Sequence, residues 1–536
     1  MKLNRMGTLA GLAAWMLAAW LCAFAAANVA VAAPTNVLLI MCDDLRPLLG
    51  CYDDPLAKTP NIDRLAARGV CFVRAYSNYP VCGPSRASML SGLRPTTTGY
   101  YGWEYVPNVP QLPAWFRQRG HYTAEFGKVY HTDRIRFPKI GEAPGRSVFV
   151  TQNPPGCWDV SDNCVTEADL DGYGYHYSAT MQDEPPALAA HIAARGSLTP
   201  PAVRGAWHWL EWVETTLPDE QTSDGLVARR AAETIERTSG QGQPFFVAAG
   251  LRRPHQILAA PKPYFDLYAL ADIPPPPAEP REHIKKLSPL AFTYPVKEAY
   301  HIYSDEDRRV FERAYRANIA YCDAQIGLLL DTLDRLSLWD STVVALTTDH
   351  GWHLGEHGGL VQKHTLFEES TRVPFVLAAP GFEAGRVCKT PIELVDLIPT
   401  LCDLCQIEPP AKLDGLSLRP LLADRGATLP RAGAVSTVRR LITADMRAAD
   451  PKLPRQPVLG LSLRTPRWRY SEWQGGEFGR ELYDEDRDPR ELNNLADDAA
   501  HAKIAARLKA ALARELARTN DTRANAPQSP PASSTP

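Results

Sequence analysis

The amino-acid sequence predicts an α/β fold in which helices flank a large parallel or mixed sheet, with a smaller C-terminal α+β subdomain. Continuous apolar runs of strand length occur at residues 36–42 and 244–250, and a β-branched run occurs at 342–348. Such runs are typical of strands buried on both faces of a parallel sheet. After about residue 435 the pattern changes to short strands, followed by a final helix over 499–517. The 536-residue chain is long enough for one large core and a smaller second unit.

Helices and further strands fill the chain between these runs, as their apolar periodicity and turn residues indicate. The predicted helices cover, in order, residues 59–68, 109–119, 222–239, 305–336 and 391–405. The further predicted strands are those at 70–75 and 122–126 and a hairpin of 458–464 with 467–473. Residues 132–215, by contrast, are irregular and rich in Pro, Gly and Trp, and we expect them to wall a substrate cleft.

Residues 1–32 have the pattern of a secretory signal. Lys2 and Arg5 begin the chain, an Ala-, Leu- and Trp-rich run follows, and Ala30-Val31-Ala32 is an A-x-A-like cleavage site. We therefore expect an exported protein in a periplasmic, secreted or lysosome-like compartment, without stable membrane insertion after cleavage. An uncleaved membrane anchor is the alternative. The formal net charge of −3 provides no global basic field, so nucleic acid is not an expected partner.

Two pairs of cysteines stand out among the 11 in the chain. Cys157 and Cys164 lie in a polar, loop-like segment and could close a small disulfide loop. Cys402 and Cys405 form a C-x-x-C on an apolar helical pattern. That spacing occurs in redox and metal sites, but no second pair stands near it, which favours core thiols.

Acidic residues follow two of the predicted buried strands. Asp43 and Asp44 come directly after the first strand, and Asp349 and His350 come directly after the strand at 342–348. Ligands of open α/β sheets bind outside the carboxyl ends of the strands, so these residues can meet at one hard cation with oxygen ligands. Taken alone, an Asp-Asp pair is more often a solvated turn or a helix N-cap.

A loop is also predicted to open into a short helix at Cys82, with Gly83 and Pro84 forming the turn at its start. Free N–H groups at a helix N-terminus favour an anion, and Arg86 adds a positive charge one turn on. A cysteine in that position has a lowered pKa and is nucleophilic. The alternative is a half-buried cysteine at an ordinary helix start, and a thiol phosphatase fits less well because it needs a longer loop between Cys and Arg.

Basic residues follow two further strands. Lys128 and His131 come after the strand at 122–126, and His255 comes after the strand at 244–250, next to two arginines. A surface lysine and structural histidines are the default interpretation of such residues. Their place at strand ends nevertheless suits them to meet an anion.

The stretch Cys82-x-Pro84-Ser85-Arg86, followed by Ser91-Gly92-Leu93-Arg94-Pro95, closely resembles the signature of the type I sulfatases. The resemblance covers residues 35–520 and is greatest to the iduronate-type enzymes, and it implies an alkaline-phosphatase-like fold. The further matching stretches are 43–47 with 50–52, 253–255, 349–352 with 354–358, and 463–465 with 469–470.

This resemblance implies a set of site residues and cofactors. A formylglycine-generating enzyme would convert Cys82 to Cα-formylglycine, and the substrate would be a sulfated carbohydrate. Lys128, His255 and Lys363 would bind that substrate, with Cys82, Arg86 and His131 completing the catalytic set. Oxygen-rich ligands favour Ca²⁺ over Zn²⁺, with Mg²⁺ as an alternative. The implied metal ligands are Asp43, Asp44, Asp349, His350 and the modified residue 82.

The implied reaction is an in-line attack on sulfur by one hydroxyl of the formylglycine hydrate, with Asp349 as base. The metal, Arg86, Lys128 and Lys363 would neutralise the sulfate oxygens. His255 would protonate the leaving alkoxide, and His131 would take a proton from the second hydroxyl to expel sulfate.

Two other functions fit parts of this pattern. A phosphonate or phosphodiester hydrolase of the same superfamily can share the nucleophile and the metal carboxylates. A non-catalytic binder of sulfated glycans would keep Cys82 as a thiol. The expected domains are a sulfatase catalytic domain at 34–430, a C-terminal subdomain at 431–518 and a disordered, Pro/Ser/Thr-rich tail at 519–536.

Overall fold

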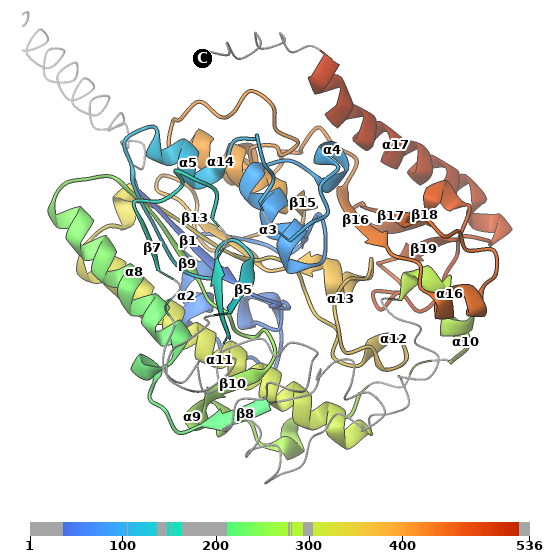
Figure 1. Cartoon of the computed structure of the whole chain (residues 1–536), viewed down its shortest axis with the longest axis horizontal. Coiled ribbons are helices and arrows are strands. Elements are labelled where there is room, and N and C mark those ends of the chain that lie inside the picture. The colour runs from blue at the N-terminus through green and yellow to red at the C-terminus, as the bar shows by residue number, and fades with distance from the viewer. Residues whose placement is uncertain are drawn as a thin grey trace, which may run out of the picture.

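The computed structural model in Figure 1 describes residues 36–136 except 104, 147–164 except 152 and 163, 212–292 except 277, 278 and 280, and 304–524. The predicted signal segment, most of the irregular segment at 132–215 and the last residues of the predicted tail lie outside these ranges. Among the described residues, none of the helices combines the length and the apolar character needed to cross a membrane.

The main sheet has eight strands in the order β14-β2-β13-β11-β1-β9-β4-β7. Among these described strands, β13 alone runs antiparallel to its neighbours. The sheet is therefore mixed but mainly parallel, which confirms the predicted fold class. Its strands, in chain order, are β1 (Asn36–Cys42), β2 (Val70–Phe72), β4 (Tyr122–Gly127), β7 (Val160–Asp162), β9 (Phe245–Gly250), β11 (Thr342–Thr348), β13 (Phe375–Ala378) and β14 (Arg386–Cys388).

Strand β1 shows why the central strands are apolar along their whole length. Leu38 and Ile40 point into one apolar cluster, and Val37, Leu39 and Met41 point into the other. Helices cover both faces, so no residue of β1 meets water. In Figure 1, one layer lies on each side of the sheet. One layer has α2 (Pro60–Arg68), α8 (Ser223–Gly240) and α11 (Asp305–Arg335), and the other has α3 (Cys82–Ser91), α5 (Leu112–Arg117) and α14 (Leu397–Leu404).

The C-terminal part forms a separate antiparallel sheet in the order β16-β17-β18-β19, seen at the right of Figure 1. The predicted hairpin is confirmed, because Val458–Arg464 pairs with Trp468–Trp473 around a tight turn. Helix α17 (Ala502–Ala524) packs Leu508 and Leu512 onto this sheet and continues past the predicted end at 517. The four strands are β16 (Ala434–Arg440), β17 (Val458–Arg464), β18 (Trp468–Trp473) and β19 (Arg480–Asp484).

Shorter elements complete the described fold. The small strands are β3 (Ala75–Tyr76), β5 (Thr132–Arg136), β6 (Ser147–Thr151), β8 (Trp212–Thr215), β10 (Leu258–Pro261), β12 (Arg372–Val373) and β15 (Ile392–Glu393). The short helices are α4 (Pro95–Thr98), α9 (Lys262–Phe265), α10 (Arg281–Lys285), α12 (Glu356–Gly359), α13 (Glu368–Thr371), α15 (Arg419–Ala423) and α16 (Ala444–Ala449).

Two local expectations need correction. Cys157 and Cys164 are both free thiols rather than a disulfide. They flank strand β7, whose extended backbone separates them along the sheet. The helix expected from residue 391 starts only at Leu397, because residues 392–393 pair as strand β15.

The C-x-x-C cysteines on and beside α14 are free as well. Burial raises the pKa of the Cys402 and Cys405 thiols to about 12. Both are therefore protonated and unreactive at neutral pH, which agrees with the prediction of core thiols.

One buried carboxyl in the main sheet predicts a pH-dependent stability. Glu125 on β4 is 1% exposed and accepts hydrogen bonds from Ser161 and Asn153 on one oxygen only. Burial raises its pKa from 4.5 to about 7. The folded chain therefore holds this proton more tightly than the unfolded chain, and stability is lost as the pH rises from about 4.5 to about 7.

We expect Glu125→Gln to remove this loss, because the amide oxygen can accept both hydrogen bonds without ionising. The free energy of unfolding of the variant, relative to wild type, should rise by about 2 to 3 kcal/mol between pH 5 and pH 8. Urea denaturation at the two pH values measures this difference. Glu233→Gln, on the exposed side of α8, is the matched control and should show no such change. An equal difference at both pH values for Glu125→Gln would contradict the prediction.

Candidate active site

Four parallel strands of the main sheet end at one edge, and residues predicted for the site follow each of them. Registers Cys42↔Thr348 and Gly127↔Gly250 align these ends. A further site residue, Cys82, begins helix α3 and is 2% exposed. The side chains that follow the strand ends are Asp43 and Asp44 after β1, Lys128 and His131 after β4, His255 after β9, and Asp349 and His350 after β11.

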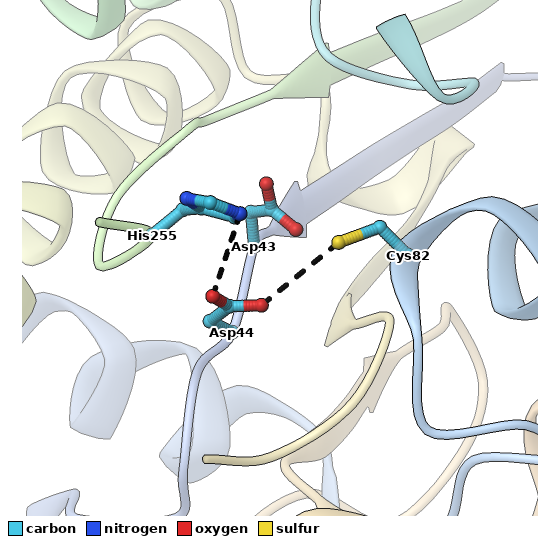
Figure 2. A group of neighbouring side chains, drawn as sticks. All are labelled: Asp43, Asp44, Cys82 and His255. Atoms are coloured by element: carbon cyan, nitrogen blue, oxygen red, sulfur yellow. Dashed lines mark hydrogen bonds and ion pairs between the residues drawn. The ribbon is translucent and has the colours of Figure 1, made fainter. Parts of the chain in front are cut away.

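The Cys82 thiol lies at the centre of this group. Its Sγ is 3.3 Å from His350 Nε2, 3.0 Å from Lys363 Nζ and 4.0 Å from Asp44 Oδ1. Figure 2 shows the Asp44 carboxylate pointing at the sulfur. Burial and Asp43 raise the pKa of the thiol, but the lysine cations outweigh them and the net pKa is lowered. The thiol therefore has the electropositive surroundings that its place at a helix N-terminus predicted.

The two carboxylates after β1 meet different partners. Asp43 contacts Lys128 and lies 3.4 Å from Arg86. Burial raises its pKa, but Lys128, His255 and Arg86 lower it further, so its pKa is well below the usual range. Asp44 accepts from Lys363 Nζ at 2.6 Å, and burial still raises its pKa to about 8. Asp43 Oδ1 and Asp44 Oδ2 are buried and make no hydrogen bond.

Arg86 and Asp349 connect the strand ends. Arg86 is fully buried and donates to Asp349 Oδ2 (2.8 Å) and to the carbonyls of Cys42 (3.0 Å) and Val129 (3.1 Å). The Asp349 Oδ1 atom accepts the backbone N–H groups of Asp44 (3.2 Å) and His350 (3.0 Å). These contacts hold β1, β4 and β11 in one register at the site.

Comparison with known proteins decides the family. The family model described as "Sulfatase" matches residues 35–407. The chain belongs to the sulfatase family.

Similar proteins of known name support the family assignment and the fold. Iduronate 2-sulfatase of Mus musculus is 30% identical over 544 residues, which cover 88% of this chain and 92% of the relative. The solved structure of phosphonate monoester hydrolase of Agrobacterium radiobacter has a TM-score of 0.68 at 25% identity, and the alignment covers 91% of this chain and 96% of that chain. The solved structure of a 2-O GAG sulfatase has a TM-score of 0.64 at 23% identity, and the alignment covers 92% of this chain and 94% of that chain. The protein is therefore a sulfuric ester hydrolase with the predicted alkaline-phosphatase-like fold.

The histidines of this sulfatase are oriented by backbone carbonyls. His350 Nδ1 is 3.0 Å from the Gly351 carbonyl, and His255 Nδ1 is 2.6 Å from the Gln256 carbonyl. Because a carbonyl only accepts, each Nδ1 carries a hydrogen and each Nε2 faces the site. His255 Nε2 lies 3.6 Å from Asp44 Oδ2 (Figure 2).

His131 and Lys363 reach the sulfatase site from two loops. Burial and Lys128 lower the pKa of His131 to about 3, so this imidazole is neutral at working pH. Its ring lies 5.0 Å from that of Trp103. Lys363 lies between α12 and α13, and its Nζ is 3.3 Å from His255 Nε2.

Two tryptophans at the sulfatase site had no role in the sequence analysis. The buried Trp352 ring lies 5.3 Å from Lys363 Nζ, and Trp103 is 58% exposed beside His131. Trp352 stands two residues after His350, and this closeness to a predicted site residue could have indicated its place. Trp103 lies in a non-periodic Tyr-Tyr-Gly-Trp stretch, which gives no indication of a place at the site.

Proposed function

We propose that this sulfatase removes sulfate from a sulfated carbohydrate, with Cys82 matured to formylglycine and a Ca²⁺ ion beside it. The observation that carries the proposal is the convergence of a buried Cys82, in electropositive surroundings, with three aspartates, two lysines and three histidines at one sheet edge. The similarity to iduronate 2-sulfatase of Mus musculus supports a sulfated sugar as substrate.

The donor set fits a hard cation. The ligand atoms of Asp43, Cys82, Asp349 and His350 lie within 4.8 Å of one another, and those of Asp44 and His255 lie as close to Asp43 and Cys82. Two buried carboxylate oxygens without hydrogen bonds are available acceptors. Mainly oxygen donors suit Ca²⁺ better than Zn²⁺, and Mg²⁺ is the alternative. A bound cation would supply positive charge against the sulfate oxygens.

The lysines are the cations that can turn to the substrate. Lys128 and Lys363 now contact Asp43 and Asp44, the carboxylates that we assign to the metal. Their flexible side chains can move to sulfate oxygens once those carboxylates have another partner. Arg86, in contrast, is enclosed by Asp349 and three carbonyls. We therefore assign Arg86 to holding the carboxylates in place.

Proton transfer falls to groups already aimed at the site. Conversion of Cys82 would supply a hydrated aldehyde with two hydroxyls as the nucleophile. Asp349 would accept the first proton, and a protonated His255 would donate its Nε2 proton to the leaving sugar oxygen. His131, which is neutral because of its low pKa, would accept the second proton and permit release of sulfate.

Organisation and maturation complete the proposal. We assign the catalytic domain to 34–430 and the C-terminal subdomain to 431–518, because the antiparallel sheet begins at Ala434. A formylglycine-generating enzyme is the proposed maturation partner, and an exported compartment the proposed location.

The test compares two kinds of substrate on protein whose tryptic peptide 75–86 has been characterised by mass spectrometry. We expect formylglycine at position 82 and faster turnover of 2-O-sulfated uronate disaccharides than of aryl phosphonate monoesters. Faster phosphonate cleavage would support the second candidate, which the structural similarity to phosphonate monoester hydrolase favours. The glycan binder would be supported by two results together. Cys82 would remain an unmodified thiol in a host with an active maturation enzyme, and the protein would bind the sulfated disaccharide without turning it over.

A further inference from the structure

The loop at 351–365, which carries Lys363, and the adjoining helix α13 hold a second buried group of metal-ligating side chains, which the proposed reaction does not use. We call His353, His357, Glu356 and Glu369 the histidine cluster. Both histidines are fully buried, and the Glu369 side chain is 10% exposed. The ligand atoms of His353, His357 and Glu369 lie within 4.8 Å of one another.

The outer hydrogen bonds of the two rings leave one nitrogen of each facing inward. His353 Nε2 is 2.8 Å from the Thr365 hydroxyl, and His357 Nδ1 is 3.0 Å from His283 Nε2. With hydrogens on these outer nitrogens, His353 Nδ1 and His357 Nε2 turn their lone pairs toward Glu369 Oε2. His353 Nδ1 is buried and makes no hydrogen bond. In this neutral form three acceptors converge on a small volume where a cation can bind. Without one, a proton on His357 Nε2 is donated to Glu369 Oε2 at 3.2 Å, and a metal ion would take the place of that proton.

The distances fit a transition-metal ion. Glu369 Oε2 is 3.2 Å from His357 Nε2 and 4.0 Å from His353 Nδ1. Tetrahedral ligands at metal–ligand distances near 2.0 Å are about 3.3 Å apart, so sub-ångström shifts would close the site. Glu356 Oε2, 3.8 Å from His353 Nδ1, offers a fourth ligand. Two imidazoles with carboxylates suit Zn²⁺ and its neighbours, whereas Ca²⁺ prefers oxygen alone.

The charge balance and the outer hydrogen bonds of the two imidazoles also support a divalent transition-metal ion. Arg46 pairs with Glu356 Oε1 at 2.5 Å, which compensates one of the two carboxylates and leaves Glu356 Oε2 toward the cluster. The outer acceptors on Thr365 and His283 are the kind of partner that orients metal-bound imidazoles.

We propose that the histidine cluster binds one divalent transition-metal ion, of the Zn²⁺ class, separate from the cation beside Cys82. This inference goes beyond the proposed function and does not depend on it. The ion would connect the loop at 351–365 to helix α13 and so fix the segment that carries Lys363.

The test measures zinc on the intact protein in the presence of excess Ca²⁺, after dialysis against Zn²⁺ and removal of free metal. Wild type should retain one Zn²⁺ per chain more than His353→Ala or Glu369→Gln, as measured by elemental mass spectrometry. Zn²⁺ should also raise the melting temperature of wild type but not of these variants. His501→Ala, a partly exposed histidine paired with one aspartate, is the matched control and should keep the wild-type zinc content. Equal zinc content in wild type and both variants would overturn the proposal.

A second measurement separates this site from the one at Cys82 and covers variants that fold poorly. Co²⁺ replacing Zn²⁺ should give a visible ligand-field absorption band in wild type. The band should be kept by Asp43→Asn and lost in the conservative His353→Gln. A band that disappears with Asp43→Asn, or that is absent from wild type, would place transition-metal binding elsewhere or nowhere.

Discussion

Replacement of Cys82 by serine is expected to reduce turnover of sulfate esters by about 10⁴-fold or more. Serine cannot yield an aldehyde by loss of sulfur, so it offers only one hydroxyl. That hydroxyl can take up sulfate, but no second hydroxyl exists to drive its release. Incubation of Cys82→Ser with substrate should therefore leave a stable sulfate ester, which intact-protein mass spectrometry detects as one added SO₃ group.

Cys405→Ser is the matched control for this variant. Cys405 is a partly buried free thiol far along the chain from the site, with a pKa of about 12, and its replacement should leave turnover within about twofold. Wild-type turnover by Cys82→Ser would show that turnover does not require formylglycine formed from the Cys82 thiol.

Asp349→Asn is expected to lower activity by about 10³-fold and to destabilise the fold by about 3 to 5 kcal/mol. The carboxylate accepts from Arg86 on one oxygen and from two backbone N–H groups on the other. An amide must turn its NH₂ toward one of these donors, which leaves a donor-to-donor contact whichever way it is placed. It also leaves the buried guanidinium of Arg86 with only Asp43, 3.4 Å away, as a charged partner.

Chemical denaturation and initial-rate assays on the same samples measure both effects. The matched control is Asp331→Asn, which breaks a surface pair with Arg64 whose side chains are 68% and 35% exposed. Such exposed pairs contribute little, so its stability should change by less than about 1 kcal/mol. If Asp349→Asn unfolds at the wild-type denaturant concentration, the buried network does not hold the strand ends as described.

The predictions that succeeded rest on the geometry of parallel strands. Asp43 and Asp349 are far apart in sequence, yet each directly follows a predicted buried strand, and parallel strands end at a common edge. The antiparallel direction of β13 was not predictable, because four apolar residues in a strand carry no information about direction.

The histidine cluster shows what the sequence does not reveal. His353 and Glu369 are separated by 16 positions in a segment without periodicity, and His283 joins them from helix α10, distant in sequence. Arg86 was expected to act on the substrate, but only the fold shows that carbonyls and carboxylates enclose its guanidinium. Loop conformation and burial depend on contacts between distant segments, which residue patterns do not encode locally.

The burial of Cys82 also restricts when this residue can be modified. At 2% exposure, the folded thiol offers no access to another enzyme, so the oxidation that we propose at this position would have to precede closure of the sheet. That closure joins Cys42 to Thr348, 306 positions later, and pairings over such separations form slowly. Under the proposed function, maturation and folding would therefore compete kinetically on each newly made chain. A chain that folds first would keep an enclosed thiol, so the active fraction of a preparation would depend on the ratio of two rates rather than on the stability of the folded protein.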